Sequence, residues 1–473
     1  MGEEIHQTEF HKKDYEDFKK RLNIETNLVR ELFKNNNFDN KDYKFGYELE
    51  LCLIDDNADP CPNNQAIINT ANNELLTHEL ARFNLEINGN PFSLTTDVFT
   101  KIENDLTNLW DLAENAANKN NAKLILCGIL PSIKEKHLNP NHFMSNLNRY
   151  MLLSSQVIKM RNRAVEINLE GEQKLHTSRN DVMLESLGTS LQVHMQVPFD
   201  ELVSAYNASL LASILMLAIS ANSKIVLGKS CWHESRIGVF EQAVDTRNIE
   251  EIKNNIIPRV HFSKGYINSF LDLFEDNFYY SPVLPEVVDT KVEDLHHLNI
   301  HNGTIWRWVR PIISKNEDSN YALRLELRVT PSGPTLIDTM SNLVFYIALV
   351  KGLTPMANKI TNINFNTLKS DFYNVAKNGI NTNITWLDNK KRNIRDVILD
   401  EGLNIAKKGL NNLNIKNYDK WLNIIESRAK TGQTGAVWQH KMWQLTQDTN
   451  KIVAIYLNNA RENKPVHSWE VKL

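Results

Sequence analysis

The sequence is poor in cysteine and carries no cysteine motif that binds metal. Its 473 residues include only four cysteines, Cys52, Cys61, Cys127 and Cys231, and no CxxC pair occurs among them. So few cysteines in a chain of this length exclude a disulfide framework and the common zinc motifs. Cys52 and Cys127 lie inside apolar runs, so we expect small core residues with free thiols in a reducing compartment.

Long hydrophobic segments and an excess of one charge are also missing. The charged N-terminus has no apolar segment of the kind found in signal peptides. The longest apolar run, 210–219, is shorter than the roughly 20 residues that span a bilayer, and we expect it to form a buried helix. With 53 basic and 57 acidic residues, the formal charge is only −4. This balance gives no indication of a nucleic-acid partner. The missing signal and membrane-spanning segments predict a cytoplasmic protein with no membrane partner.

Two common phosphate-binding motifs are absent from the chain, because neither GxxxxGK[ST] nor GxGxxG occurs. A nucleotide phosphate site must therefore depend on metal ions and arginines instead of a glycine-rich loop. No internal repeat and no Pro-, Gly- or Ser-rich linker divides the chain, which favours one catalytic unit.

Helical segments and short strand-like segments follow one another irregularly along the chain. Helical periodicity predicts helices over 1–40, 103–120, 202–222, 338–358 and most of 390–462. This mixture favours an α+β fold with an antiparallel sheet over a regular βαβ alternation. We expect three parts: an N-terminal helical segment (1–40), a catalytic domain (41–385) and a helical C-terminal portion packed on the same domain (386–473).

Four strand-like segments alternate apolar and polar residues: 47–54, 83–88, 191–197 and 324–330. Residues two apart share one face of a strand. An ordinary wet face carries a solubilising mixture that includes lysine. These faces carry instead Glu48 and Glu50; Asn84 and Glu86; Gln192, His194 and Gln196; and Arg324, Glu326 and Arg328.

Carboxylates that crowd one sheet face without neighbouring lysines would repel one another. Divalent ions would relieve this repulsion, and Mg²⁺ takes oxygen ligands from carboxylates and from substrate phosphates. His194 can complete one such site, while Arg324 or Arg328 can meet phosphate oxygens. The residues alone therefore indicate a funnel, lined by one face of a sheet, that holds magnesium and a nucleotide.

Seven segments, in their order along the chain, resemble the glutamate–cysteine ligase family, in particular its group-two carboxylate–amine ligase branch, which is related to glutamine synthetase. They are GYELELCLID (46–55), HELARFNLEING (78–89), GTSLQVHMQVP (188–198), SANSKIVLGKSCWHESRIGVFEQAVDTR (220–247), GTIWRWVRP (303–311), LRLELRVTPSGPT (323–335) and TGQTGAVWQ (431–439). Each motif is weak alone, but the resemblance extends from about residue 45 to 465.

The resemblance implies a glutamine-synthetase-like α+β fold, whose curved antiparallel sheet forms an active-site funnel flanked by helices. It implies an ATP- and Mg²⁺-dependent ligase, in the first place a glutamate–cysteine ligase of glutathione biosynthesis that forms γ-glutamylcysteine through an acyl phosphate. About two or three Mg²⁺ ions are expected, with Mn²⁺ as a substitute. The expected partners are small molecules: ATP, glutamate, and cysteine or another amine. The resemblance leaves open whether the chain is a monomer or a homodimer.

The same resemblance implies roles for single residues. The implied metal ligands are Glu48, Glu50, Glu79, Glu86, His194 and Glu326. Glu326 and Arg328 are the implied catalytic residues, with Arg328 neutralising the transferring phosphoryl group. Arg236, Arg310 and Gln192 are the implied substrate-binding residues, and Gln196 and Arg328 the implied ATP-binding residues. A loop should close over the site, because the intermediate hydrolyses easily.

Some assignments have alternatives at this level. Gln192 stands where many group-two members carry His, and Gln196 where many carry a small residue, so the substrate is less well defined than the family. Glu79 is expected to end a helix, where it could simply be solvated. Arg236 could pair with Glu234 or Glu241 instead of binding substrate.

Other functions also remain possible for this sequence. A related ligase could join glutamate or another carboxylate to a different amine. A hydrolase with paired carboxylates, such as a glycosidase, would use two acids without ATP. A catalytically silent relative would bind nucleotide and metal without turnover. Trp306 and Trp308 are expected to pack in the core and not to stack on adenine.

Overall fold

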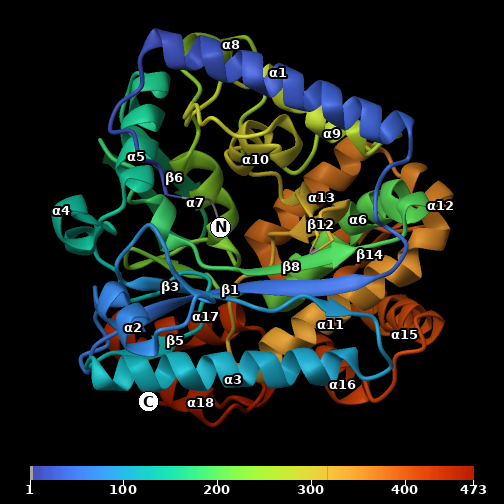
Figure 1. Cartoon of the computed structure of the whole chain (residues 1–473). Helices are drawn as coiled ribbons and strands as arrows, with labels where there is room; N and C mark the ends of the chain where they lie inside the picture. The colour runs from blue at the N-terminus through green and yellow to red at the C-terminus, as the bar shows by residue number, and fades with distance from the viewer. Residues whose placement is uncertain (1–3, 317) are drawn as a thin grey trace.

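An eight-stranded antiparallel sheet forms the centre of the computed structural model, which describes residues 4–316 and 318–473 (Figure 1). The strand order is β11–β12–β8–β1–β3–β2, and two short strands, β4 and β5, also pair with β1. The strands are β1 (Lys44–Ile54), β2 (Leu76–His78), β3 (Asn84–Asn88), β4 (Phe92–Ser93), β5 (Lys123–Ile125), β8 (Leu191–Gln196), β11 (Val309–Lys315) and β12 (Tyr321–Leu327). The predicted α+β fold with a curved antiparallel sheet is confirmed.

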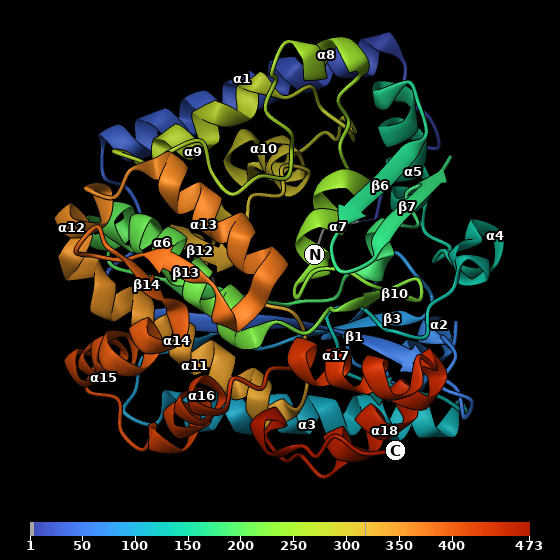
Figure 2. The same ribbon diagram turned by 180° about the vertical axis from the view of Figure 1, so that it is seen from behind.

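Helices surround this sheet on both faces. In Figure 1, α3 lies below β1 and α1 lies across the top, and Figure 2 shows α16, α17 and α18 on the same side as α3. The longer helices are α1 (Lys12–Lys34), α2 (Asn64–Ala71), α3 (Val98–Lys119), α5 (Asn148–Arg161), α6 (Leu202–Ser220), α7 (Ser235–Ala243), α10 (His296–Gly303), α11 (Leu336–Leu353), α13 (Phe365–Asn378), α15 (Leu403–Asn412), α16 (Asp419–Thr431), α17 (Gly435–Thr446) and α18 (Thr449–Arg461).

Short helices and ribbons complete the chain. The short α-helices are α4 (Pro140–Phe143), α8 (Ile249–Lys253), α9 (Leu271–Glu275), α12 (Ala357–Thr361) and α14 (Ile394–Val397). The two-stranded ribbons are β6 (Val165–Glu170) with β7 (Lys174–Arg179), β9 (Ile225–Val226) with β10 (Lys229–Ser230), and β13 (Asn383–Thr385) with β14 (Lys391–Asn393). The last ribbon crosses the expected boundary at residue 386, and the domain division stays a prediction.

The alternating pattern of β1 sets its two faces. Tyr47, Leu49 and Leu51 are at most 2% exposed and share a core with α3, α6 and α11. Glu48 and Glu50 point to the opposite face because side chains alternate along a strand. Burial of each large aliphatic side chain contributes about 1.5–3 kcal/mol, so the apolar face fixes the register of β1 and thereby the direction of its glutamates.

Two helices in this core are apolar on all sides. The helical segments Phe199–Ser220 and Leu336–Thr361 are long and apolar enough to cross a membrane by length and composition alone. However, 89% and 83% of their most apolar windows are buried inside the protein, which is the pattern of core helices. The 210–219 run lies within the longer segment Phe199–Ser220, and the expected buried helix is confirmed.

The other expected elements are present with shifted limits. The first helix begins at Lys12, and residues 1–3 of the expected 1–40 segment lie outside the described residues. The expected helical stretch from 390 was wrong at its start, because β14 occupies 391–393. All four cysteines are buried and free, as expected.

Candidate active site

The register of four neighbouring strands brings the predicted polar positions into rows. Glu48 of β1 lies opposite Gln192 of β8, and Glu50 lies opposite Glu86 of β3. His194 of β8 lies opposite Glu326 of β12. Side chains alternate along each strand, and directly paired residues on neighbouring strands point to the same face. These side chains therefore share the face of the sheet that is opposite the α3 core.

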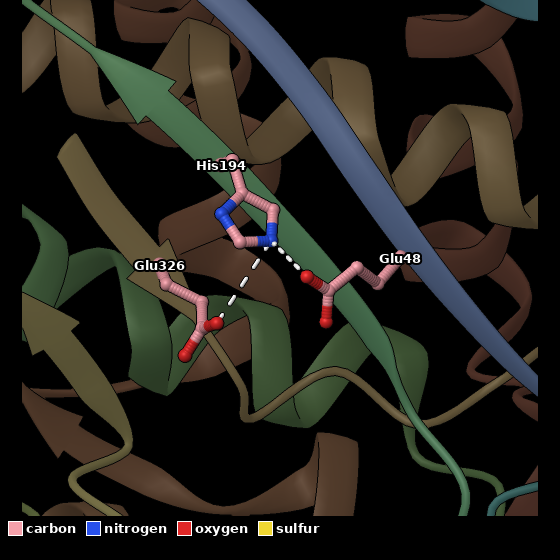
Figure 3. A group of neighbouring side chains, drawn as sticks. All are labelled: Glu48, His194 and Glu326. Carbon is pink, nitrogen blue, oxygen red and sulfur yellow. Dashed lines mark ion pairs between the residues drawn. The ribbon is translucent and has the colours of Figure 1, made fainter. Parts of the chain in front are cut away.

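One cluster, here called the histidine group, consists of Glu48, His194 and Glu326 (Figure 3). One ligand atom from each residue lies within 4.8 Å of the others. His194 Nε2 is 3.2 Å from Glu48 Oε1 and 3.8 Å from Glu326 Oε1. This Nε2 is buried, yet it makes no hydrogen bond with the described residues. A ring nitrogen without a hydrogen bond between two carboxylates fits a bound divalent cation.

The other cluster, the glutamate group, consists of Glu50, Glu79 and Glu86, again with ligand atoms within 4.8 Å of one another. Burial, followed by repulsion from Glu50, raises the pKa of Glu79 to about 8. Burial, followed by repulsion from Glu48 and Glu79, raises the pKa of Glu86 well above its ordinary value. Three carboxylates that disfavour ionisation together are a donor set that a divalent cation would neutralise.

Glu79 does not end a helix, contrary to expectation. It follows directly after β2 and precedes a bend, and its Oε2 accepts from the Leu80 amide at 3.3 Å. The segment joins the sheet because its apolar residue Leu76 packs in the core and pairs with Ile87 of β3. Glu79 therefore reaches the glutamate group from the edge of the sheet and is not a solvated helix terminus.

Two arginines bind Glu326, which is fully buried. Arg310 Nε lies 2.7 Å from Oε2 and Arg310 Nη2 donates to Oε1 at 2.8 Å, while Arg328 Nη1 donates to Oε2 at 3.1 Å. Burial opposes the ionisation of Glu326, but Arg310 and Arg328 overcome it and lower its pKa to about 2. Glu326 is therefore held as a carboxylate before any metal binds.

Gln192 connects the two clusters. Its Nε2 donates to Glu50 Oε1 at 2.8 Å, and its Oε1 accepts a short hydrogen bond from Arg328. The other oxygen of Glu50 accepts from the Ser190 amide at 2.7 Å. Because Arg328 also contacts Glu326, a chain of hydrogen bonds links the glutamate group to the histidine group.

Arg236 of α7 is buried beside the C-terminal end of β12, and its side chain already has hydrogen-bond partners. Its Nη2 donates to the backbone carbonyls of Arg328 and Val329, and its Nε lies 3.3 Å from Glu234 Oε1. The pairing with Glu234, one of the two alternatives, is therefore present. The Trp308 ring packs against Arg236, and its centroid is 5.4 Å from the guanidinium carbon Cζ. Trp308 is also buried, which confirms a packing role.

Gln196 lies apart from both clusters. Its Nε2 donates to the backbone carbonyls of Asp39 and Asp42, both at 3.2 Å. No hydrogen bond of Gln196 reaches another predicted site residue within the described part of the chain. Its amide nitrogen fixes the segment that enters β1, which leaves Oε1 available for a ligand.

A small cavity of about 30 Å³ lies beside the glutamate group and is lined by Glu50, Glu79, Arg236 and Arg328. The sequence reading missed Glu185, which also lines this cavity. Burial, followed by repulsion from Glu50, raises the pKa of Glu185 to about 7. Glu185 lies in a single 3₁₀ turn, Glu185–Leu187, where no periodicity could have marked it.

Asn84 is a second residue whose role the sequence did not reveal. It is 2% exposed, lines the same cavity, and its Oδ1 makes no hydrogen bond among the described residues. The period-two pattern had placed it on the polar face beside Glu86, and this was the available signal. The cavity therefore offers carboxylates, an amide oxygen and two guanidinium groups within one small volume.

The family comparison gives one match that spans most of the chain. The model of glutamate–cysteine ligase family 2 matches residues 44–457. Among curated proteins, none matches this sequence significantly. The matched range includes both clusters, Gln192 and all the arginines described above.

Two solved structures are similar to this chain at low sequence identity. A glutamate–cysteine ligase from Francisella tularensis in complex with AMP has 12% identity and a TM-score of 0.55, with 92% of this chain and 91% of that chain covered. A bifunctional glutathione synthetase from Pasteurella multocida has 10% identity and a TM-score of 0.48, and the match covers 89% of this chain and 53% of that one. The first of these similarities supports the fold and no finer property.

Proposed function

This chain belongs to glutamate–cysteine ligase family 2, and we propose that it is an ATP- and Mg²⁺-dependent ligase that joins the γ-carboxylate of glutamate to the amine of cysteine. Carboxylate–amine ligation is what family membership supports. The observation that carries the finer proposal is the sheet face on which the histidine group and the glutamate group lie side by side. The AMP bound to the Francisella tularensis ligase supports an adenine nucleotide as co-substrate.

The proposed reaction has two steps. The γ-carboxylate of glutamate attacks the γ-phosphorus of ATP, ADP leaves, and an acyl phosphate forms. The amine then attacks the acyl carbon, a proton leaves the nitrogen, and phosphate departs with the former carboxylate oxygen. Both steps concentrate negative charge, so catalysis depends on positioning and on electrostatic stabilisation.

The two clusters would hold the divalent cations. Glu48, His194 and Glu326 would hold one, and the glutamate group would hold another. Bound Mg²⁺ supplies positive charge that neutralises phosphate oxygens. The buried Nε2 of His194 without a hydrogen bond and the raised pKa values of Glu79 and Glu86 are the features of this chain that support the assignment.

The arginines have a more restricted role than the sequence implied. Arg328 carries its charge at the junction of both clusters, where it can stabilise the transferring phosphoryl group. Arg310 uses two nitrogens on Glu326, and Arg236 uses Nη2 on two carbonyls. To hold a substrate α-carboxylate, either residue must exchange these partners or use its remaining N–H groups.

The test is phosphate release from MgATP with glutamate, in the presence and absence of cysteine, with products identified by mass spectrometry. We expect phosphate release that requires cysteine, together with γ-glutamylcysteine. Release that requires glutamate but yields no such product would overturn the choice of cysteine and lead to a panel of other amines. No turnover with any carboxylate, despite binding of Mg²⁺ and nucleotide, would favour the catalytically silent alternative.

A hydrolase with paired carboxylates finds no support in the family match. Turnover that does not depend on ATP would nevertheless reinstate it. We place the reaction in the cytoplasm, on the basis of the four free thiols. The chain would act in glutathione biosynthesis if cysteine is the amine.

A further inference from the structure

A second cavity, of about 370 Å³, lies away from the sheet face. It is bounded by α1, α5, α8 and the segment 279–281. In Figure 1 these three helices lie at the upper edge of the molecule, while β1 and β8 run through its middle. Small-molecule sites have volumes of about 300–1,000 Å³, so the cavity has the size of a ligand site.

Arg259 is the most buried charged residue that lines this cavity, with 1% of its surface exposed. Its Nε donates to Thr246 Oγ1 at 3.0 Å, its Nη1 to the Thr304 carbonyl at 3.2 Å and its Nη2 to the Ser281 carbonyl. All three acceptors are neutral, and a guanidinium has five N–H groups, so two remain. The guanidinium also lies 5.5 Å from the centroid of the Tyr280 ring. Burial lowers the pKa of Arg259 to about 10, and the opposing influence of Tyr280, Glu251 and Asp245 does not overcome it.

Other cations converge on the same cavity. Lys19 enters from α1 and Lys159 from α5, and neither forms an ion pair within the described residues. Arg247 also lines the cavity, although Asp245 pairs with it at 2.9 Å. Against four cations the lining has one carboxylate, Glu251, which accepts from the Asn248 amide at the start of α8. The lining residues therefore have a formal balance of +3.

The rim of the cavity is aromatic and aliphatic. Tyr279 is 77% exposed, Ile256 is 45% exposed and Ile257 is 38% exposed, and all three line the cavity. Exposed apolar side chains that gather around a pocket mark a surface that another molecule covers. An aromatic ring offers such a molecule a flat contact area.

We propose that this cavity is a second ligand site, which takes a small phosphate-bearing molecule with a flat or apolar group. A buried guanidinium without a bonded carboxylate is costly, and an anion beside Arg259 would compensate it. A phosphomonoester fits better than a single carboxylate, because it carries about −1.5 to −2 charges at pH 7 against the lining balance of +3. The flat or apolar group would cover Tyr279 and the two isoleucines.

The cavity is also connected to the sheet face through the backbone. His261, two residues after Arg259, forms a β-bridge with Arg307, and its carbonyl accepts from the Trp308 amide at 3.2 Å. Trp308 lines the small cavity beside the glutamate group. The two sites are therefore separate, but they share one segment of chain, and binding at the second site does not depend on the ligase proposal.

The test is calorimetric titration of the full-length protein with AMP and with inorganic phosphate, in EDTA and at low salt. The decisive variant is the pair Lys19→Glu and Lys159→Glu, because both side chains are exposed and their change leaves Arg259 and the core intact. Lys20→Glu is the control for the change on α1: it makes the same charge change as Lys19→Glu at the neighbouring position, but it lies outside the cavity lining and removes only the exposed ion pair with Asp17.

We expect saturable binding of AMP that is tighter than that of phosphate, a loss of at least about tenfold in the double variant, and less than about twofold in Lys20→Glu. Thermal unfolding should show that all variants are folded. No saturable binding of either probe would overturn the proposal, as would equal affinity in the double variant and the control. Binding that Arg328→Ala abolishes and the double variant retains would place the ligand at the sheet face and would also overturn it.

Discussion

The histidine group and the glutamate group share one sheet face but differ in how their charges are balanced. In the histidine group, Arg310 and Arg328 bind Glu326 and hold it ionised. In the glutamate group, burial and repulsion between neighbouring carboxylates prevail, and they raise the pKa values of Glu79 and Glu86. Similar residues at similar spacing therefore have opposite protonation tendencies.

This difference shows that one group is prepared by the protein and the other needs a cation. Because Glu326 is already ionised, a metal ion can bind it without the release of a proton. The glutamate group must release protons first, so its metal affinity should depend on pH. Gln192 joins the two groups through Glu50 and Arg328, so an ion in one should influence the other.

The largest effect is expected from Glu326→Gln. The variant leaves Arg310 and Arg328 buried without their carboxylate, and loss of one partner of a buried pair costs about 3–5 kcal/mol. We expect a lower Tm even in EDTA, and ligase activity reduced by about 10³-fold. Calorimetry and the phosphate-release assay measure both. Glu170→Gln, the same change at an exposed position of β6, should leave both unchanged. An unchanged Tm for Glu326→Gln would contradict the charge balance described here.

Glu86→Gln is expected to change the stability in the opposite direction from Glu326→Gln. Removing one of three repelling buried carboxylates should leave Tm in EDTA unchanged or raise it, by roughly 1 kcal/mol in the free energy of unfolding. The same variant should bind Mg²⁺ at least about 10–100-fold more weakly. Thermal unfolding with and without Mg²⁺ tests both statements. If Glu86→Gln and Glu326→Gln lowered the Tm in EDTA equally, the two groups would not differ as proposed.

The pH dependence of stability should expose Glu79. Its pKa is about 8 in the folded protein against an ordinary 4.5, so between these pH values the folded chain binds more protons than the unfolded chain. The free energy of unfolding therefore falls as pH rises through this window. In EDTA, the Tm advantage of Glu79→Gln over the natural chain should be smallest at pH 5 and largest at pH 8. Saturating Mg²⁺ should reverse this advantage, and a constant difference across the window would refute the assignment.

The smallest effect is expected from Gln192→Ala, which removes the link between the groups. We expect activity to fall about tenfold and Mg²⁺ binding to lose any coupling between sites, because each hydrogen bond contributes about 1 kcal/mol. Asn207→Ala is the control: it also loses two hydrogen bonds, but to the backbone of Ile267 and away from the groups. Its Tm should fall slightly while activity changes less than about threefold. Equal loss of activity in both variants would deny Gln192 a linking role.

The sequence predicted which side chains share a face, because parity along a strand follows from covalent geometry. Glu48, Glu50 and His194 were assigned to one face on this ground, and the structure places them there. The division into two groups was not predictable, since it depends on register. Nothing in the local sequence says that Glu50 lies opposite Glu86 or that His194 lies opposite Glu326.

The remaining misses have separate physical causes. Glu185 lies in a 3₁₀ turn, so no periodic pattern marks it. Glu79 was predicted as a metal ligand, but its place directly after β2 was not, because it lies outside a regular strand. Two arginine contacts were missed because pairing and packing in the folded chain supply them. Glu326, the partner of Arg310, lies opposite it on the neighbouring strand β12, and the Val329 carbonyl that Arg236 binds lies 93 residues further along the chain. The ribbon of β13 and β14 has only three residues in each strand, which is too short to override the helical pattern around it.

The burial of α6 and α11 against each other has a consequence for synthesis of the chain. About 115 residues separate the two helices, and a ribosome adds about 5–20 residues per second. For roughly 6–23 seconds, a nascent chain therefore presents an apolar helix whose neighbour has not yet been made. We expect the emerging polypeptide to engage a holdase chaperone during this interval, and fragments that stop before residue 336 to aggregate.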